Sequence, residues 1–291
     1  MTIPAFGVRG RRRVRPPRAS GLAARLRPFA VVALVATVMG VPLWLIVSTA
    51  AKSQSEALSP DLSLPSRWLL WDNLAQVWTQ GDIPAAFLGS VLIVVPAVAL
   101  VLTFGSMAAW ILARRATRLN AVLYALAISG IVLPPAVVTI VLLLRQLGLA
   151  GTLTGMIGVY VGIYLSTVVF FVTGFVRTVP LSIEEAARMD GAGPVRVFVS
   201  VILPMLRPVL ATATILICLY VWNDVFYAFF VIGGRMDTLP LNLFQVANAG
   251  LYLNNWHLIF AYIILMSLPL LVVFAVAQRR IISGITGGAV K

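Results

Sequence analysis

The sequence predicts an all-α integral membrane protein with six transmembrane helices and a long cytoplasmic loop between the fourth and the fifth. Three observations carry this prediction. Hydrophobic residues make up 60% of the 291 residues and charged residues 11%, against about 45–50% and about 25% in soluble domains. Apolar runs long enough to cross a bilayer recur along the chain. Arginines gather between alternate runs, as they do on the cytoplasmic side of membrane proteins.

Six apolar runs meet the length of about 20 residues that a helix needs to cross the hydrocarbon core of a bilayer. We expect them at residues 28–50, 87–112, 120–144, 156–176, 208–232 and 258–278. The sequence lacks the short alternating segments of membrane barrels. Prolines within the runs, such as Pro42 and Pro96, are tolerated in packed membrane helices and predict kinks.

The basic residues orient these helices. With the N-terminus in the cytoplasm, 18 of the 22 Lys and Arg residues fall in the tail or in inner loops, as the positive-inside rule requires. Both termini are therefore predicted to be cytoplasmic. The net charge of +13 does not indicate nucleic acid, because the arginines flank helices and form no single basic stripe.

Residues 1–27 are predicted to be a basic cytoplasmic tail, and residues 28–291 the transmembrane domain. The tail carries RGRRRVRPPR, from Arg9 to Arg18. A basic segment before an apolar run can be a signal peptide, but the charge-free run of 24 residues at 28–51 is too long for one. We expect an uncleaved anchor behind a disordered tail. The tail's charge sets the orientation or, alternatively, contacts anionic lipid headgroups.

The chain offers little for metal or redox chemistry. Cys218 is its one cysteine and His257 its one histidine, which excludes an internal disulfide and a cluster of cysteine or histidine ligands. The sequence contains no phosphate loop of the form G-x-x-x-x-G-K-[ST], so ATP binding is not expected in this chain. We expect no catalytic, cofactor or metal site.

Two outer segments carry distinctive residues. The loop at 51–86 holds Trp68, Trp71 and Trp78 at roughly helical spacing. This favours an amphipathic interfacial helix over a docking surface for an external partner. The glycines of GLAGTLTGMIGVYVG (148–162) form small-xxx-small pairs, which allow close helix packing either within the chain or against a second subunit.

The loop at 177–207 reads RTVPLSIEEAARMDGAGPVRVFVSVILPMLR and is the longest inner loop. Ser182 has the spacing of an N-cap that forms a capping box with Glu185, and the alanines that follow favour helix. Gly191 ends this helix. A second helix, VRVFVSVIL, then starts at Pro194 and ends at the prolines of LPMLRP. Connections of this length are usually functional.

This loop resembles that of binding-protein-dependent ABC importers, whose permeases carry E-A-A, three residues, G, nine residues and I-x-L-P. Here Glu185-Ala186-Ala187 is followed after three residues by Gly191, and after nine more by Val201-Ile202-Leu203-Pro204. The one departure is Val201 in place of Ile.

The resemblance extends to the sugar-importing branch, the G-type permeases of the maltose system. VLPPAVVTIVLLLRQLGLAGTLTG, WND at 222–224 and the terminal GITGGAVK are similar to that family, over roughly residues 85–291. Gly89-Ser90 stands where the family often has Asn-Ser, which puts a side-chain contact there in doubt.

The resemblance implies that this chain is a permease subunit of an ATP-driven importer, with a coupling helix seated in a groove of a cytoplasmic ATPase subunit. It assigns the coupling to Glu185, Ala186, Ala187, Asp190, Gly191, Leu203 and Pro204. The implied partners are a second, F-type permease subunit, two ATPase subunits that bind ATP and Mg, an extracytoplasmic solute-binding protein and membrane lipid. The implied location is the cytoplasmic (inner) membrane of bacterial or archaeal type.

Asp224 is the acidic residue most embedded in an apolar run. It lies about 16 residues into the fifth run, or about 24 Å along a helix, which places it toward the outer surface. With Asn223 it is a candidate for lining the translocation path or its gate. The alternative, a hydrogen-bonded or water-reached acid, is favoured by the mild desolvation at that depth.

We therefore expect import of a carbohydrate, with another polar solute such as glycerol phosphate, a polyol or a peptide as the alternative. An ion-coupled secondary transporter would need paired intramembrane charges, and Asp224 has no obvious partner within a run. Transport that survives ATP depletion would favour it. A membrane scaffold without a pore is the third class, and a complex that hydrolyses ATP but moves nothing would favour that.

Overall fold

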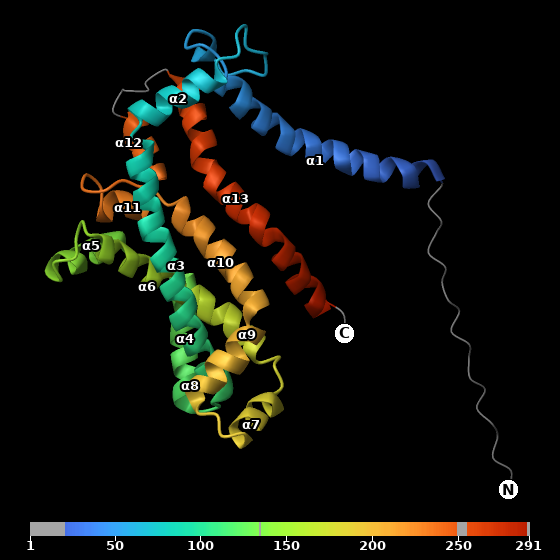
Figure 1. The fold of residues 1–291 in the computed structure, drawn as a ribbon, viewed down its shortest axis with the longest axis vertical. Helices are drawn as coiled ribbons and strands as arrows, with labels where there is room; N and C mark the ends of the chain where they lie inside the picture. The colour runs from blue at the N-terminus through green and yellow to red at the C-terminus, as the bar shows by residue number, and fades with distance from the viewer. Residues whose placement is uncertain (1–20, 134, 249–254, 290–291) are drawn as a thin grey trace, which may run out of the picture. The chain divides into compact units, whose positions relative to one another are not determined.

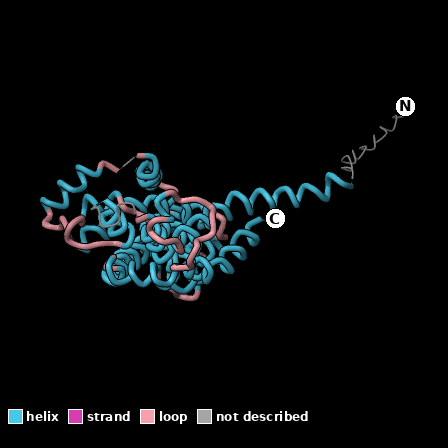
Figure 2. Tube along the Cα trace, turned by 90° about the horizontal axis from the view of Figure 1, so that it is seen from above, coloured by secondary structure: helices cyan, strands magenta, loops and turns pink. Residues whose placement is uncertain are grey.

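A computed structural model describes residues 21–133, 135–248 and 255–289. These residues form helices and connecting loops, with no strand among them (Figure 2), which confirms the all-α prediction. The chain divides into two compact units, residues 1–45 and 46–291. Residues 1–20, the greater part of the predicted basic tail, lie outside the described residues.

Helix α1 (Gly21–Ala50) supplies the described part of the first unit, and its last five residues belong to the second. It begins before the predicted residue 28 and has Pro28 and Pro42 within it. The side chains from Phe29 to Leu43 are mostly apolar and exposed. A helix of this length with such a surface suits the hydrocarbon core of a bilayer.

The second unit holds the remaining elements, whose order Figure 1 shows. They are η1 (Glu56–Leu58), α2 (Leu70–Gln80), α3 (Ile83–Arg114), α4 (Arg118–Val132), α5 (Val137–Gln146), α6 (Leu153–Val176), α7 (Leu181–Met189), α8 (Pro194–Val197), the π-helical turn η2 (Phe198–Ile202), α9 (Leu203–Met205), α10 (Arg207–Trp222), α11 (Phe226–Val231), α12 (Leu239–Asn248) and α13 (Trp256–Ala289).

Four of the described helices, α1, α3, α6 and α13, contain segments long and apolar enough to cross a membrane. Two bent pairs, α4 with α5 and α8–α9 with α10, raise the number to six if each pair is one span. The second pair bends by 75°. The prediction of six spans lies at the upper end of this range.

Each of the predicted spans 120–144 and 208–232 is divided into two helices. The first is divided between α4 and α5 in the proline-containing stretch between Val132 and Val137, as the prolines within that run predict, because proline lacks the N–H that an inner helical turn needs. The second is divided between α10 and α11 at Asp224. The Asp224 carboxylate accepts the N–H of Ala228 (3.0 Å). This bond satisfies a backbone N–H in the first turn of α11 and so favours a helix start there.

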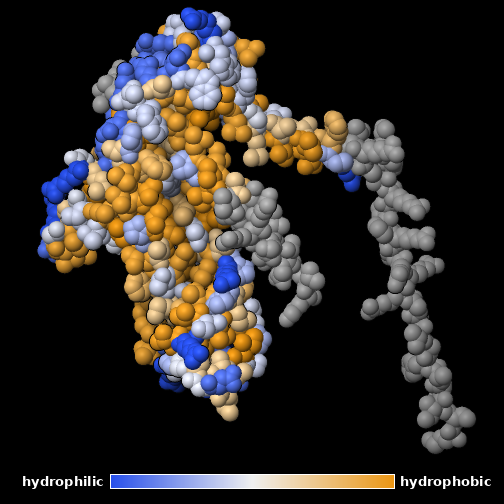
Figure 3. Space-filling view, in the orientation of Figure 1, coloured by the Kyte–Doolittle hydropathy of each residue, from blue (hydrophilic) through white to orange (hydrophobic). Residues whose placement is uncertain are grey.

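Helix α3 runs through the second unit from the α2 end toward the end that carries α7 and α8 (Figure 1), and α6 packs along it. The contact is close because Gly105 of α3 faces Val168 of α6: a Cβ on Gly105 would lie 2.6 Å from a Val168 methyl carbon. Helix α10 packs against α3, α6 and α13. Hydrophobic side chains cover the middle of this unit, and hydrophilic ones gather at the ends that carry α2 and α7 (Figure 3).

The start of α3 explains the Gly89-Ser90 pair. A Cβ on Gly89 would lie 2.1 Å from the carbonyl oxygen of Asp237, so a larger residue does not fit. The Ser90 hydroxyl accepts the N–H of Leu239 at 2.8 Å and is itself buried. Together they dock the segment before α12 against α3, which is a packing role.

We predict that Gly89→Ala destabilises the protein by about 1–3 kcal/mol, the usual cost of overpacking, because the Asp237 carbonyl must move. Thermal unfolding in detergent, followed by tryptophan fluorescence, measures this. Gly158→Ala is the matched control, since nothing lies within 4 Å of a Cβ there and alanine favours helix. Equal melting temperatures for the two variants would contradict the packing assignment.

Candidate functional site

Helix α7 carries the predicted coupling residues. It begins at Leu181 after Pro180, and no side chain caps its N-terminus, so the predicted capping box of Ser182 and Glu185 is wrong. Pro180 has φ −58° and ψ 132°, an extended conformation that occupies the N-cap position, so the helix starts two residues earlier than predicted. Ser182 therefore lies inside the first turn and is exposed.

The end of α7 is as predicted. Gly191 has φ +81°, a conformation that glycine adopts without strain. The N–H of Gly191 donates to the carbonyl of Arg188 at 3.0 Å, and the N–H of Ala192 to that of Ala187 at 3.0 Å. This pair of bonds is a Schellman motif, and it turns the chain sharply toward α8, which starts at Pro194.

Glu184 joins α7 to the rest of the molecule. Its side chain is completely buried, and Arg114 at the end of α3 donates from Nε to its Oε1 at 2.6 Å. Trp110 donates from Nε1 to Oε2 at 3.2 Å, and Arg188 lies 3.4 Å from Oε2. Arg114 also donates to the carbonyl of Val179 at 2.9 Å. We call Glu184, Arg114 and Trp110 the Glu184 anchor.

Sequence reasoning assigned no partner to Glu184 and therefore missed the anchor. One signal was available. Glu184 and Arg188 stand four apart, the spacing that places two residues on one helix face, and Ala187 between them is half-buried. The partner Arg114 is 70 positions away, and no local pattern points to it.

The opposite face of α7 is open to solvent. Glu185, Ala186 and Asp190 are exposed, and Ala187 is half-buried. The sequence did not single out Met189 and Val195, which are 87% and 76% exposed and add apolar area to the same loop. This surface is small-featured and mixed in polarity, which suits insertion into a partner's cleft.

Leu203 and Pro204 lie elsewhere, in the second helix of the loop. They are half-buried and line a cavity of about 650 Å³ with Arg207 and Thr214. The chain forms the π-helical turn η2 before them, where the N–H of Leu203 donates to the carbonyl of Phe198. Pro204 explains the turn, since its ring clashes with the carbonyl four residues back in a regular α-helix.

Phe198 ties this second helix to the anchor as well. Its ring lies 5.5 Å from that of Trp110, centroid to centroid. Trp110 thus contacts both helices of the loop: α7 through its Nε1 and η2 through its ring. Both arms of the loop meet the end of one long helix, α3.

Asp224 has partners that the sequence did not reveal. The hydroxyl of Tyr160 on α6 donates to its Oδ2 at 2.8 Å, and the N–H groups of Ala228 and Tyr227 donate at 3.0 and 3.4 Å. Among the residues described, no cationic side chain pairs with it. Asn223 is exposed and donates to the carbonyl of Leu219 at 2.9 Å.

Three tyrosines stack beside Asp224. The rings of Tyr160 and Tyr164 lie 6.2 Å apart with 24° between their planes. Those of Tyr164 and Tyr220 lie 5.7 Å apart and nearly parallel, at 4°. Tyr220 is 54% exposed. We call Tyr160, Tyr164 and Tyr220 the tyrosine column; with Asp224, which Tyr160 contacts, it forms a polar aromatic strip between α6 and the end of α10.

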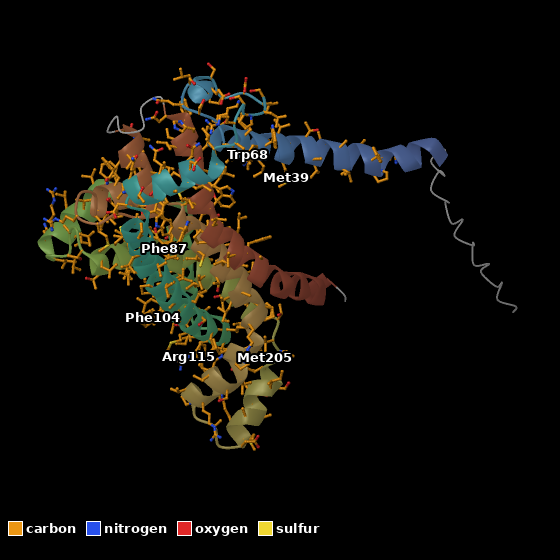
Figure 4. The ribbon with its side chains drawn as sticks, turned by 45° about the horizontal axis from the view of Figure 1, so that its top comes forward. Met39, Trp68, Phe87, Phe104, Arg115 and Met205 are labelled. Carbon is orange, nitrogen blue, oxygen red and sulfur yellow. The ribbon has the colours of Figure 1, made fainter. Side chains whose placement is uncertain are left out.

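The outer loop is folded. Asn73 of α2 donates from Nδ2 to the carbonyls of Ala50 and Lys52 at 2.8 and 3.0 Å. The buried Lys52 ammonium is paired with Asp61 and also donates to Ser63 at 3.0 Å. Trp68, Trp71 and Trp78 are half or more exposed, as an interfacial helix requires, and Trp68 is labelled in Figure 4.

The glycine pairs have two different surroundings. At Gly151 and Gly155 the chain's own atoms fill the space a Cβ would take. At Gly158 and Gly162 nothing described lies within 4 Å of a Cβ, and both line a shallow cavity beside α5. The second pair is thus left free for a surface outside this chain. The described residues contain no cluster of three His, Cys, Asp or Glu side chains that could hold a metal.

A helical membrane chain with an anchored, exposed loop has the architecture of a class of transporter permeases. The chain belongs to the family described as the binding-protein-dependent transport system inner membrane component, which covers residues 101–287. It is therefore a permease of the ABC-importer class, a membrane component that works with a solute-binding protein and an ATPase.

Relatives over nearly the whole chain agree with this class. The chain is 31% identical to the melibiose/raffinose/stachyose import permease protein MelC of Bacillus subtilis, over 92% of this chain and 99% of MelC. It is 33% identical to the diacetylchitobiose uptake system permease protein NgcG of Streptomyces coelicolor, over 90% and 87%.

A solved structure shares the fold. It is a bacterial ABC transporter involved in the import of the acidic polysaccharide alginate. The match has a TM-score of 0.76 at 20% identity and covers 91% of this chain and 99% of that one. The helical architecture is therefore that of an ABC importer permease.

We predict that acid releases the outer loop. Hydrogen bonds from Ser66 and Ser53 lower the pKa of Glu56 from 4.5 to about 2, and those from Lys52 and Ser63 lower the pKa of Asp61 from 3.8 to about 2. Because both pKa values are depressed, the stabilisation is complete above the unfolded values and is lost as pH falls toward 2.

Hydrogen exchange of the Leu69 amide, which donates to the Ala51 carbonyl at 2.9 Å, reports this loss after correction for intrinsic rates. Protection should fall between pH 5 and 2.5, while amides in α6 stay protected. Glu56→Gln should show weakened protection already at neutral pH. Constant protection of Leu69 across that range would rule the carboxylates out as the cause.

Proposed function

We propose that this chain imports a carbohydrate as one permease subunit of an ATP-driven, binding-protein-dependent transporter. It couples the closure of ATPase subunits to alternating access through residues 182–204. The observation that carries the proposal is the Glu184 anchor, which fixes the exposed coupling helix to α3. The substrate class is supported by the names of relatives that import melibiose, raffinose, stachyose and diacetylchitobiose.

Because the anchor bonds α7 to α3, force applied to α7 is transmitted to α3. A partner that closes on Glu185, Ala186 and Asp190 pushes the exposed face of the helix, while the opposite face is bonded to α3 through a carboxylate and a guanidinium. Charge-assisted hydrogen bonds of this kind are about twice as strong as neutral ones. Removing one partner of a buried pair typically costs about 3–5 kcal/mol, so the helix does not slide past α3 under load.

The complete transporter in this proposal has further subunits. A second, F-type permease completes the pore, and the open faces of Gly158 and Gly162 suit close packing against it. Two cytoplasmic ATPase subunits hold ATP and Mg, while this chain binds neither. Both termini and α7 lie on the cytoplasmic side, and the tryptophan-bearing helix α2 lies on the outer side with the solute-binding protein.

The polar aromatic strip supports a second part of the proposal, that Asn223 and Asp224 line the translocation path. Asp224 holds Tyr160 and the start of α11 in place, and Tyr220 presents an exposed ring beside exposed Asn223. An aromatic face with an amide next to it suits the mixed apolar and hydroxyl surface of a sugar ring.

We predict that Glu185→Ala and Gly191→Pro abolish coupling in proteoliposomes of the full importer. The first removes an exposed contact, and the second cannot adopt φ +81° at the end of α7. Sugar uptake per ATP hydrolysed should fall at least tenfold, with the complex still assembled. Ser182→Ala is the matched control, because Ser182 is exposed and caps nothing.

Normal uptake by both coupling variants would remove the coupling assignment. Uptake that survives ATP depletion would replace the proposal with an ion-coupled transporter. The structure gives Asp224 a neutral hydroxyl and backbone amides as its partners, which does not support the paired charges that such a transporter needs.

We predict that Asp224→Ala lowers sugar uptake roughly tenfold, because hydrogen bonds to a charged group are worth about 1.5–3 kcal/mol. Assembly and ATPase stimulation should persist. Tyr160→Phe removes one of the donors and should have a smaller effect in the same direction. Uptake at the normal rate in Asp224→Ala would remove the residue from the path.

A further inference from the structure

A cavity lined by arginines lies next to the Glu184 anchor, at the end of α3, and has no role in the proposed coupling. It has a volume of about 650 Å³ and opens between the end of α3, the start of α4 and the end of α6. Arg115, which lines it, is labelled at the far end of α3 from Phe87 in Figure 4. The lining residues are Leu112, Ala113, Arg115, Ala116, Thr117, Arg118, Asn120, Ala121, Tyr124 and Arg177.

The cavity is strongly positive. Arg115, Arg118 and Arg177 line it and are exposed, and among the described residues no carboxylate forms a salt bridge with any of them. Their neighbour Arg114, in contrast, is neutralised by Glu184. Arg177 is held in place by stacking over the ring of Tyr124, 5.0 Å from its centroid. Three guanidiniums without a paired carboxylate lie together at the ends of three helices, an arrangement that favours a bound anion.

The walls of the cavity are apolar. Leu112, Ala113 and Ala121 contribute hydrocarbon surface below the guanidiniums. A soluble anion leaves this apolar surface uncovered, whereas the acyl chains of a lipid bury it.

We propose that this cavity binds an anionic phospholipid, with its phosphate among Arg115, Arg118 and Arg177 and the upper part of its acyl chains against Leu112, Ala113 and Ala121. The proposal rests on the proposed orientation, which places this end of the molecule in the cytoplasmic leaflet, where anionic headgroups meet basic pockets between membrane helices. It does not depend on the identity of the imported solute. Guanidinium groups match phosphate through paired hydrogen bonds.

The test measures phosphatidylglycerol retained by the full importer in native mass spectrometry, titrated against phosphatidylcholine. Arg115→Gln, Arg118→Gln and Arg177→Gln should each weaken phosphatidylglycerol binding roughly 5-fold, the usual effect of one arginine at an anionic surface. Arg145→Gln is the matched control: it removes one exposed arginine outside the cavity and should change nothing. Tyr124→Leu frees Arg177 without changing charge and should weaken binding less.

Three results would overturn the proposal. Arg145→Gln could weaken binding as much as the cavity variants, which would indicate non-specific charge. Inorganic phosphate could displace the lipid, which would indicate a soluble anion. Ala121→Cys could cross-link to the second permease, which would indicate a protein interface. Sugar uptake by the reconstituted importer tests the proposed function separately, because unchanged lipid retention in the three arginine variants together with normal uptake rejects this site alone.

Discussion

The buried carboxylate of Glu184 is the constraint on which the inner half of the structure depends. A buried charge needs an opposite charge or hydrogen-bond donors next to it. Arg114 and Trp110, from the last turns of α3, supply both to Glu184. Because those partners belong to one long helix, α7 cannot tilt or translate without α3. The exposed face of α7 is then free to serve a partner chain, since its position is already fixed from behind.

The N-terminal end of α3 is held by close packing and a hydrogen bond, and not by an ion pair. Gly89 admits the Asp237 carbonyl, and Ser90 binds the N–H of Leu239. Along its middle, Gly105 admits Val168 of α6. Helix α3 therefore contacts α7 at one end, α6 along its middle and the segment before α12 at its other end, and α6 carries Tyr160, the partner of Asp224. The loop at 177–207 and the polar aromatic strip are joined through α3 and α6.

The sequence predicted much of this and missed what depends on distant contacts. Composition and arginine placement predicted the helical membrane class, and the spacing of Gly191 predicted where α7 ends. The capping box at Ser182 was wrong because Pro180, two positions upstream, sets the helix start. Glu184 and Asp224 each meet a partner more than 60 positions away, which no local pattern encodes. Gly89 was read as a departure from a family motif, but its cause is a carbonyl from another segment.

The most direct test of the central claim is the ratio of sugar imported to ATP hydrolysed by the full importer carrying a charge exchange at the anchor. Arg114→Glu and Glu184→Arg should each lower this ratio at least tenfold while ATP hydrolysis continues, because α7 is no longer bonded to α3. Combining the two changes should restore most of it by re-forming the ion pair. Single variants that keep the normal ratio, or a double variant no better than either, would contradict the account.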